Sequence, residues 1–209
     1  MKLWQRVIKR LMDLAASVAA LIVLSPILIV LAIAIRLDSR GPALFRQPRL
    51  GKGRVPFTIY KFRTMQVNAP DIRNADGSTF NADNDPRVTR VGRFLRKTSL
   101  DELPQLINVV KGDMSLVGPR PDVVDALRIY RPQDYVRLTV KPGITGWAAI
   151  HGRNTLPLDR RRDLDIEYVE NSSMRLDLKI LLRTIPYALL SRDVYTTQPA
   201  PRKDIHVHD

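Results

Sequence analysis

The chain has 209 residues, the size of one domain with a short appended segment, and its 44% of apolar residues is enough for a folded core and argues against disorder. It contains no cysteine and three histidines, so disulfides and thiolate zinc sites are excluded and a histidine-based metal site is disfavoured. Its 34 Lys and Arg residues exceed its 21 Asp and Glu residues by 13, an excess typical of proteins that bind nucleic acid, anionic lipid or a phosphorylated substrate.

An uncharged apolar segment covers residues 14–35. A helix of about 20 such residues can cross a membrane, and the segment exceeds the apolar region of about 7–15 residues in a signal peptide. Ser25-Pro26 lies in its middle, where proline predicts a kink or a break. A spanning helix usually has its basic residues at one end, whereas here both ends are basic. The sequence therefore favours a re-entrant helix-break-helix anchor over residues 1–40, with a single span as the alternative.

A polar domain is predicted for residues 41–195, followed by a polar tail over 196–209. Apolar alternation within residues 43–65 predicts two short strands around the turn Gly51-Lys52-Gly53. The predicted helices are a basic one from residue 91, one over 100–110 that Gly112 can end, a polar one over 122–138, and an apolar one over 176–190 interrupted at Pro186. The chain is thus predicted to be α+β, with a small, mostly helical domain after the membrane segment.

Residues 66–86 are rich in Asn, Asp, Gly and Pro, which indicates a surface loop. Its carboxylates could bind a cation, although turn formation is the favoured use for Asp76, Asp83 and Asp85.

The densest chemistry lies between residues 87 and 121. Ser99 and Glu102 have the spacing of a capping box, in which Ser99 begins a helix and Glu102 bonds back to its amide. The same helix start would favour anions and keep Asp101 ionised. Basic side chains upstream could neutralise a diphosphate, namely Arg87, Arg90, Arg93, Arg96 and Lys97.

A carboxylate such as Asp101 can attack phosphorus and form an acyl phosphate. A neighbouring acid such as Glu102 can help to hold the divalent cation that screens the repulsion between the two anions. The residues by themselves fit phosphoryl or phospho-sugar transfer without naming the reaction.

The chain resembles the monotopic phosphoglycosyl transferases, the bacterial sugar transferase family that acts on polyprenyl phosphate. The resemblance runs in order from about residue 7 to residue 190. It rests on K-R-x-x-D at 9–13, Ser25-Pro26, Y-K-F-R-T-M at 60–65, N-D-P-R-V-T-R-V-G-R-F-L-R at 84–96, S-L-D-E-L-P-Q at 99–105, G-D-M-S-L-V-G-P-R-P at 112–121, K-P-G-I-T-G-W at 141–147, G-R-N at 152–154, D-x-x-Y-V-E-N at 165–171 and D-L-K-I-L-L-R-T at 177–184.

The resemblance implies Mg²⁺-dependent transfer of a sugar phosphate from a UDP-sugar to polyprenyl (undecaprenyl) phosphate, with release of UMP. Asp101 would be the nucleophile and Glu102 would help to place Mg²⁺. The residues expected at the substrates are Arg96 and Arg120 for phosphate, Pro119 and Pro121 at the nucleotide, and Lys61 and Arg63 as weaker candidates.

The same resemblance implies a re-entrant helix broken at Ser25-Pro26, on the cytoplasmic face of the bacterial inner membrane. Membrane lipid, a second copy of the chain and downstream glycosyltransferases are the expected partners. The sequence departs from the family pattern at Ala148-Ala149 and after Asn154, so no particular sugar is predicted.

Two alternatives belong to other functional classes. The first is a membrane-anchored nucleic-acid-binding protein, suggested by the net charge; no nucleic-acid-binding motif supports it, so nucleic acid is not an expected partner. The second is a membrane scaffold that has lost its activity, which the intact Asp101-Glu102 pair disfavours.

Overall fold

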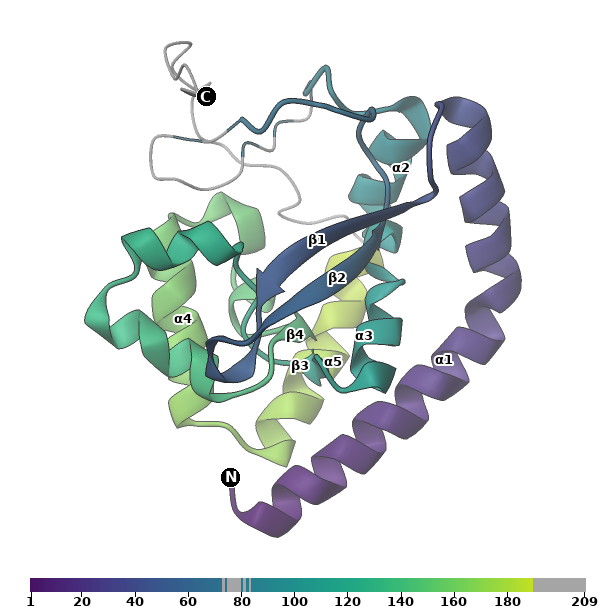
Figure 1. Cartoon of the computed structure of the whole chain (residues 1–209). Coiled ribbons are helices and arrows are strands. Elements are labelled where there is room, and N and C mark those ends of the chain that lie inside the picture. The colour runs from purple at the N-terminus through teal and green to yellow at the C-terminus, as the bar shows by residue number, and fades with distance from the viewer. Residues whose placement is uncertain (73, 75–79, 81, 83, 190–209) are drawn as a thin grey trace.

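The computed structural model describes residues 1–72, 74, 80, 82 and 84–189, with side chains of the last helix described as far as residue 186. Asp76, Asp83 and the predicted tail therefore lie outside the described residues. The elements are α1 (Leu3–Asp38), β1 (Leu44–Leu50), β2 (Pro56–Phe62), α2 (Arg90–Thr98), α3 (Gln105–Lys111), β3 (Ser115–Val117), β4 (Gly143–Thr145), α4 (Leu158–Glu170) and α5 (Met174–Leu189). This arrangement confirms the predicted α+β class (Figure 1).

The two predicted strands form the antiparallel hairpin β1–β2, in which Leu44 pairs with Phe62 and Leu50 with Pro56. The turn between them contains Gly53 at φ +68°, a left-handed value that glycine adopts without strain. The hairpin lies across the front of the domain in Figure 1, with α3 behind it. Its last strand, β2, carries Lys61 towards the interior of the domain.

A second, parallel sheet joins β3 to β4, in segments where the sequence predicted no strand. Ser115 pairs with Gly143 and Val117 with Thr145. Glycines let the two backbones approach closely, since a Cβ on Gly143 would lie 2.1 Å from the Gly118 nitrogen. Strands of three residues carry too little periodicity to be recognised in a sequence, because only their pairing defines them.

Helix α1 is continuous through Pro26, so the helix break predicted there is not seen. Proline cannot donate to the Ile22 carbonyl four residues earlier, and the Ser25 hydroxyl donates to that oxygen instead, at 2.8 Å. The freed carbonyl is thus satisfied within the helix. Figure 1 shows that the axis of α1 changes direction along its length, so the structure has a bend where the sequence predicted two helices.

The N-terminal third of α1 is fastened to the polar domain. The Lys9 ammonium pairs with Asp177 of α5 at 2.7 Å, and the Asp13 carboxylate accepts a bond from the Ser115 hydroxyl at 2.7 Å. Arg10 donates to the carbonyls of Val109 and Val110 in the last turn of α3, and the Val109 carbonyl also accepts from the Gly112 amide.

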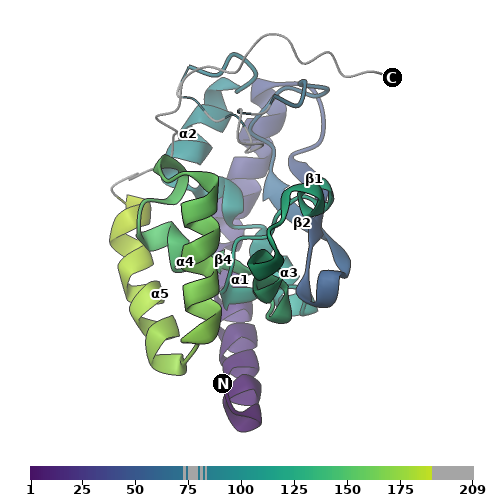
Figure 2. The same ribbon diagram turned by 90° about the vertical axis from the view of Figure 1, so that its left-hand side faces the viewer.

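The C-terminal end of α1 is fastened to the same domain. Leu31 and Ile35 are buried with Phe62 of β2 and Leu95 of α2. Asp38 accepts a hydrogen bond of 2.9 Å from the Val91 amide in the first turn of α2. In Figure 2, α1 passes behind the domain and its N-terminal end projects beyond the other elements.

Between these two attachments, α1 presents exposed apolar side chains, among them Ile22, Val23, Ile29, Val30 and Ile33. Within the described residues, α1 is the one helix that is long and apolar enough to cross a membrane. Exposure of an apolar band of this size is typical of a surface that contacts lipid.

Several predicted helices are shorter than the sequence suggested. Residues 100–110 divide into a 3₁₀ turn (Leu100–Glu102) and α3, because Pro104 precedes α3, while Gly112 ends it as predicted. Residues 122–138 form two 3₁₀ helices, Val124–Ile129 and Pro132–Thr139, instead of one α-helix.

Helix α5 differs from its prediction in the opposite way, because it continues through Pro186, where an interruption was predicted.

Candidate active site

Asp101 and Glu102 lie on the 3₁₀ turn between α2 and α3. Ser99 ends α2 in the left-handed conformation, at φ +57°, and its side chain makes no capping bond. The capping-box interpretation is therefore wrong. A non-glycine residue at positive φ is strained, and such strain is common at functional sites. The turn presents two adjacent carboxylates whose surroundings differ.

Glu102 is buried and its carboxylate forms ion pairs with three cations, two of which also donate hydrogen bonds to it. The Oε1 atom lies 3.0 Å from Lys61 Nζ, 3.0 Å from Arg120 Nη2 and 3.5 Å from Arg153 Nη2. Lys61 comes from β2, Arg120 from the loop after β3, and Arg153 from a 3₁₀ turn after β4. The fold thus brings together three of the candidate residues, since Lys61 and Arg120 both contact Glu102 from positions 41 and 18 residues away in the chain.

Arg153 was missed as a site residue, although it belongs to the quoted G-R-N motif at 152–154. It has φ +44°, and besides facing Glu102 it donates to the Ser99 hydroxyl at 2.8 Å. It therefore ties the carboxylate turn to a distant part of the chain. Both Ser99 and Arg153 have strained backbone conformations. Their mutual hydrogen bond is one of the contacts that hold the two residues in these conformations.

Asp101 differs from its neighbour because no hydrogen bond or ion pair engages its carboxylate within the described part of the chain. Burial raises the pKa of Asp101, and Glu102 raises it further, while Lys61, Arg153 and Arg96 lower it. The pKa of Glu102 lies well below its usual range: burial opposes this, but the charges of Lys61, Arg120 and Arg153 outweigh it. The environment thus distinguishes the two adjacent carboxyl groups. The charge of Glu102 is neutralised by neighbouring cations, whereas the Asp101 carboxylate remains available for another partner.

Arg96 reaches the site from the last turn of α2. Its Nε donates to the Thr64 hydroxyl at 3.0 Å, and its charge is close enough to lower the pKa of Asp101. Gly92 allows α2 to lie this close to Thr64, since a Cβ on Gly92 would lie 2.0 Å from the Thr64 carbonyl oxygen.

Arg87, in contrast, is buried with its Nη2 atom 2.7 Å from Oδ2 of Asp85, which gives both residues a structural role in the loop. This pair also occupies the Asp85 carboxylate that could have bound a cation.

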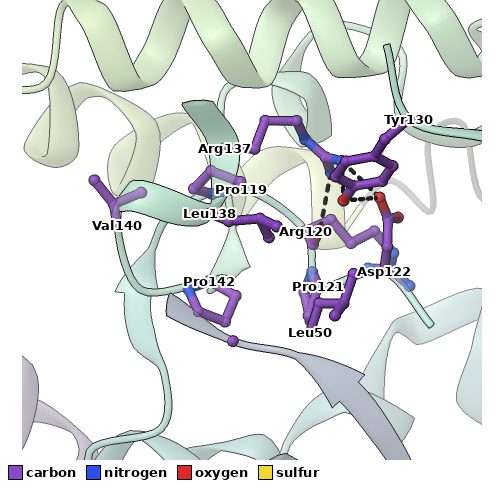
Figure 3. A pocket seen from close by; sticks show the side chains of 11 residues that line it. Leu50, Pro119, Arg120, Pro121, Asp122, Tyr130, Arg137, Leu138, Val140 and Pro142 are labelled. Atoms are coloured by element: carbon purple, nitrogen blue, oxygen red, sulfur yellow. Dashed lines mark hydrogen bonds and ion pairs between the residues drawn. The ribbon is translucent and has the colours of Figure 1, made fainter. Parts of the chain in front are cut away.

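The Pro119-Arg120-Pro121 segment is fixed through its backbone, although two of its three residues have no N–H. Its three carbonyls accept, in order, from the Gly143 amide at 2.9 Å, from Arg137 at 3.1 Å and from Arg49 at 3.2 Å. Figure 3 shows this segment beside Arg137 and Asp122. The segment therefore projects the Arg120 side chain from a rigid base.

A cleft of about 530 Å³, including its open mouth, lies next to Arg120 and Arg153. Residues 143–146 line it together with Ala148, Ala149, Asn154 and Leu158. Three of the positions at which the sequence departs from the family pattern, Ala148, Ala149 and Leu158, therefore line the cleft beside Arg120 and Arg153.

Comparison with known proteins agrees with this geometry. The model of the family described as bacterial sugar transferase matches residues 4–191. This chain belongs to the bacterial sugar transferase family. The predicted resemblance to polyprenyl-phosphate phosphoglycosyl transferases is thereby confirmed, and the protein is a transferase of that class.

Three relatives illustrate the range of the family. The "uncharacterized sugar transferase EpsL" of Bacillus subtilis is 45% identical over 191 residues, which cover 91% of this chain and 92% of that protein. The "undecaprenyl-phosphate glucose phosphotransferase" of Komagataeibacter xylinus is 46% identical over 92% of this chain, which spans only 38% of that protein. The "UDP-glucose:undecaprenyl-phosphate glucose-1-phosphate transferase" of Caulobacter vibrioides is 44% identical, covering 90% of this chain and 72% of that protein.

Arg63 lies away from the carboxylates of the transferase. It is buried, and its guanidinium donates to the Ser39 hydroxyl and to the carbonyls of Ser39 and Pro42 at 2.7–2.8 Å. These oxygens follow the C-terminal end of α1, where carbonyls lack helical partners. This geometry favours a structural role for Arg63 over the substrate contact expected from the sequence.

The carboxylate pair fits a magnesium site only in combination with substrate. Within residues 1–72, 74, 80, 82 and 84–189, no group of three or more acidic or histidine side chains is found. Mg²⁺ is commonly held by one or two carboxylates together with the phosphates of a substrate. Asp101 and Glu102 could supply the protein ligands, while the surrounding cations would oppose an ion that arrives without a diphosphate.

The Lys61→Met variant tests the electrostatic origin of the Asp101 pKa. Lys61 is the largest of the charges that lower this pKa, so its removal raises the pKa. A nucleophile must be ionised, so activity is retained above the pKa and lost as pH falls through it. We expect the acidic limb of the rate–pH profile to move to higher pH in Lys61→Met. Lys52→Met, in the exposed turn between β1 and β2, should leave the limb in place; equal shifts in both variants would contradict this account.

Proposed function

We propose that the protein transfers a sugar 1-phosphate from a UDP-sugar to polyprenyl phosphate through a covalent intermediate on Asp101. The observation that supports this most strongly is the unequal carboxylate pair, in which Glu102 is neutralised by three cations and Asp101 has no hydrogen-bond partner within the described residues. The names of the relatives, which act on UDP-glucose and undecaprenyl phosphate or on undecaprenyl phosphate and glucose, agree with this reaction class.

In the first step, an oxygen of Asp101 attacks the phosphorus that carries the sugar. The bond from that phosphorus to the bridging oxygen breaks, and UMP leaves with the electron pair. In the second step, a phosphate oxygen of the lipid attacks the same phosphorus, and the bond to Asp101 breaks. The carboxylate is regenerated, and the products are polyprenyl-diphosphate-sugar and UMP, without a net proton transfer or water.

The residues around Asp101 have distinct parts in this scheme. Arg120 and Arg153 lie where they can bind the diphosphate while still facing Glu102, and their fork geometry suits phosphate oxygens. Arg96 adds charge from the side of α2. Asp101 and Glu102 would hold Mg²⁺ with the substrate phosphates, and the ion would screen the repulsion between carboxylate and diphosphate.

UMP release from a panel of UDP-sugars tests the reaction. The assay compares undecaprenyl phosphate with its absence, and Mg²⁺ with a chelator. Release that needs both components is the expected result, and the donor that supports it identifies the sugar. Absence of release from every donor, with a protein that remains folded, would argue for the scaffold alternative. A salt-sensitive shift of DNA by the protein would instead favour the nucleic-acid alternative.

We further propose that α1 enters the membrane and returns to the same, cytoplasmic face of the bacterial inner membrane. Both ends of α1 contact the same folded domain, through Asp13 and Lys9 at one end and Ile35 and Asp38 at the other. A straight span would place those ends on opposite sides of the bilayer. The exposed apolar residues lie between the attachments, as a re-entrant helix requires.

Single-cysteine labelling tests this topology, and the natural chain contains no cysteine to interfere. We expect cysteines introduced as Lys2→Cys, Arg40→Cys and Asp125→Cys to react with an impermeant reagent from the same side of sealed vesicles. Asp125 reports the side of the polar domain, since it is exposed on the 3₁₀ helix after β3. A cysteine at Val23 should stay protected. Labelling of positions 2 and 40 from opposite sides would overturn the proposal.

A further inference from the structure

A buried ionic network lies directly behind the Pro119-Arg120-Pro121 segment, and the reaction proposed above makes no use of it. Its centre is Arg137, which is 5% exposed and comes from the 3₁₀ helix Pro132–Thr139. Asp122 and Asp165 flank Arg137, and Tyr130 joins them from the preceding 3₁₀ helix. Figure 3 shows Arg137, Tyr130 and Asp122 grouped above the Arg120 segment.

Arg137 uses every N–H group that an arginine possesses. Its Nε and Nη2 donate to Asp165 at 3.1 and 2.8 Å, its Nη1 donates to Asp122 at 2.5 Å and to the Tyr130 oxygen at 2.9 Å, and its Nη2 also donates to the Arg120 carbonyl at 3.1 Å. Four of these bonds go to side chains within the network. The fifth goes to the backbone of the residue whose side chain contacts Glu102.

Asp165 supports the same network from α4. Its Oδ2 atom accepts from Nε and Nη2 of Arg137, at 3.1 and 2.8 Å. Burial raises the pKa of Asp165 to about 6, although the Arg137 guanidinium lowers it. Asp165 thus holds the guanidinium that binds the carbonyl of Arg120.

The Arg120 side chain needs such support because it is itself 46% exposed. A long, half-exposed arginine loses side-chain entropy when it is held in one geometry, and its neighbours in sequence are prolines that cannot donate a backbone bond. A buried charged network is also costly to desolvate, and apolar residues often replace one without loss of stability. The network therefore has a better explanation in the positioning of Arg120 than in stability alone.

We propose that Arg137 and Asp165 are positioning residues that together clamp the backbone of Arg120: Arg137 binds its carbonyl and Asp165 holds Arg137 in place, so that the Arg120 guanidinium faces Glu102 and the donor diphosphate. The inference deepens the proposed function and depends on it for the role of the diphosphate. The clamp itself is a statement about the fold and can be tested separately. An error of about 1 Å in the placement of a substrate-binding group can lower a rate by about a hundredfold.

A double-mutant cycle tests whether Arg137 acts through Arg120. The four proteins are the wild type, Arg137→Lys, Arg120→Ala and the double variant, and kcat and KM for the UDP-sugar are measured in each. We expect Arg137→Lys to lower kcat by about 10- to 100-fold, with a smaller change in KM. We expect the double variant to be no slower than Arg120→Ala. Independent effects that multiply in the double variant would overturn the inference.

Arg131→Lys is the control. Arg131 pairs with Asp134 at 2.8 Å and with Asp163 at 2.7 Å without contacting Arg120. We expect Arg131→Lys to lower the unfolding temperature, while kcat stays near that of the wild type. Equal losses of kcat in both variants would show that loss of any ion-paired arginine, and not the clamp, lowers the rate.

Amide hydrogen exchange supplies a readout that does not depend on activity. The Gly143 amide donates to the Pro119 carbonyl at 2.9 Å, so its exchange rate reports on how firmly the segment is held. We expect faster exchange of this amide in Arg137→Lys and unchanged exchange in Arg131→Lys. Unchanged exchange in Arg137→Lys would overturn the clamp even if the enzyme is active. Faster exchange in a protein that is inactive on every donor would support the clamp and reject the proposed reaction.

Discussion

The Asp101→Asn variant is expected to release UMP at least about a thousandfold more slowly than the wild type, because an amide cannot replace a carboxylate as the nucleophile. The substitution keeps the size of the side chain. It also removes one of two adjacent charges, so the 3₁₀ turn and the three cations on Glu102 should remain in place. The measurement is the UMP release assay with the donor that the wild type uses.

A second readout separates loss of the nucleophile from loss of substrate binding. With a donor labelled in the sugar phosphate and no lipid acceptor, the wild type should become covalently labelled and Asp101→Asn should not. Asp125→Asn, at an exposed position away from the carboxylate pair, should behave as the wild type in both assays. Full activity or covalent labelling of Asp101→Asn would place the nucleophile at another residue.

The Gly143→Ala variant is expected to lose about 2–4 kcal/mol of folding free energy together with most of its activity. The added Cβ would lie 2.1 Å from the Gly118 nitrogen and 2.4 Å from the Thr145 carbonyl oxygen. Both are backbone atoms of the β3–β4 pair, so neither can move aside as a flexible side chain would. The Gly143 amide also binds the Pro119 carbonyl, so separation of the strands displaces the segment that carries Arg120.

Gly53→Ala provides the control for this prediction. Gly53 lies in the β1–β2 turn at φ +68°, and a Cβ there would meet no atom within 4 Å. We expect a loss of about 1 kcal/mol from backbone strain and an unchanged rate per folded molecule. Thermal unfolding in detergent measures the stability of both variants. Equal destabilisation at the two positions would show that conformational strain, and not the close approach of the strands, explains the effect.

The sequence was most informative where a pattern extends over many residues. The apolar stretch from residue 14 to 35 predicted a long apolar helical segment, which forms most of α1, and the residues around the turn Gly51-Lys52-Gly53 predicted the hairpin. The family motifs contain Lys61, Glu102 and Arg120, and in the structure Lys61 and Arg120 each lie 3.0 Å from the same oxygen of Glu102. Family motifs can therefore point to residues that lie together in the fold, even when the chemistry of each residue taken alone gives only a weak argument.

The sequence was least informative where a distant contact decides a local conformation. Ser99 and Glu102 have the spacing of a capping box, but Lys61 and Arg153 take these side chains away from any helix start. Arg63 has the appearance of a substrate residue because it lies two residues after Lys61, but β2 ends at Phe62 and the Arg63 guanidinium is held by the oxygens of Ser39 and Pro42. Pro26 predicts a break only if nothing satisfies the carbonyl that it leaves unpaired, and Ser25 satisfies it.

The attachment of α1 at both of its ends has a consequence for the acceptor lipid. Because Lys9 and Asp38 are bound to the same folded domain, the bend of α1 cannot move towards or away from Asp101 independently. In the proposed topology, the depth of the bend in the bilayer sets the height of Asp101 above the membrane plane. A phosphate carried by a membrane lipid is confined to the headgroup layer. The enzyme would therefore select its acceptor partly by the height of the phosphate above the membrane plane. A water-soluble phosphate of the same chemistry is not confined to that height and would rarely be found there.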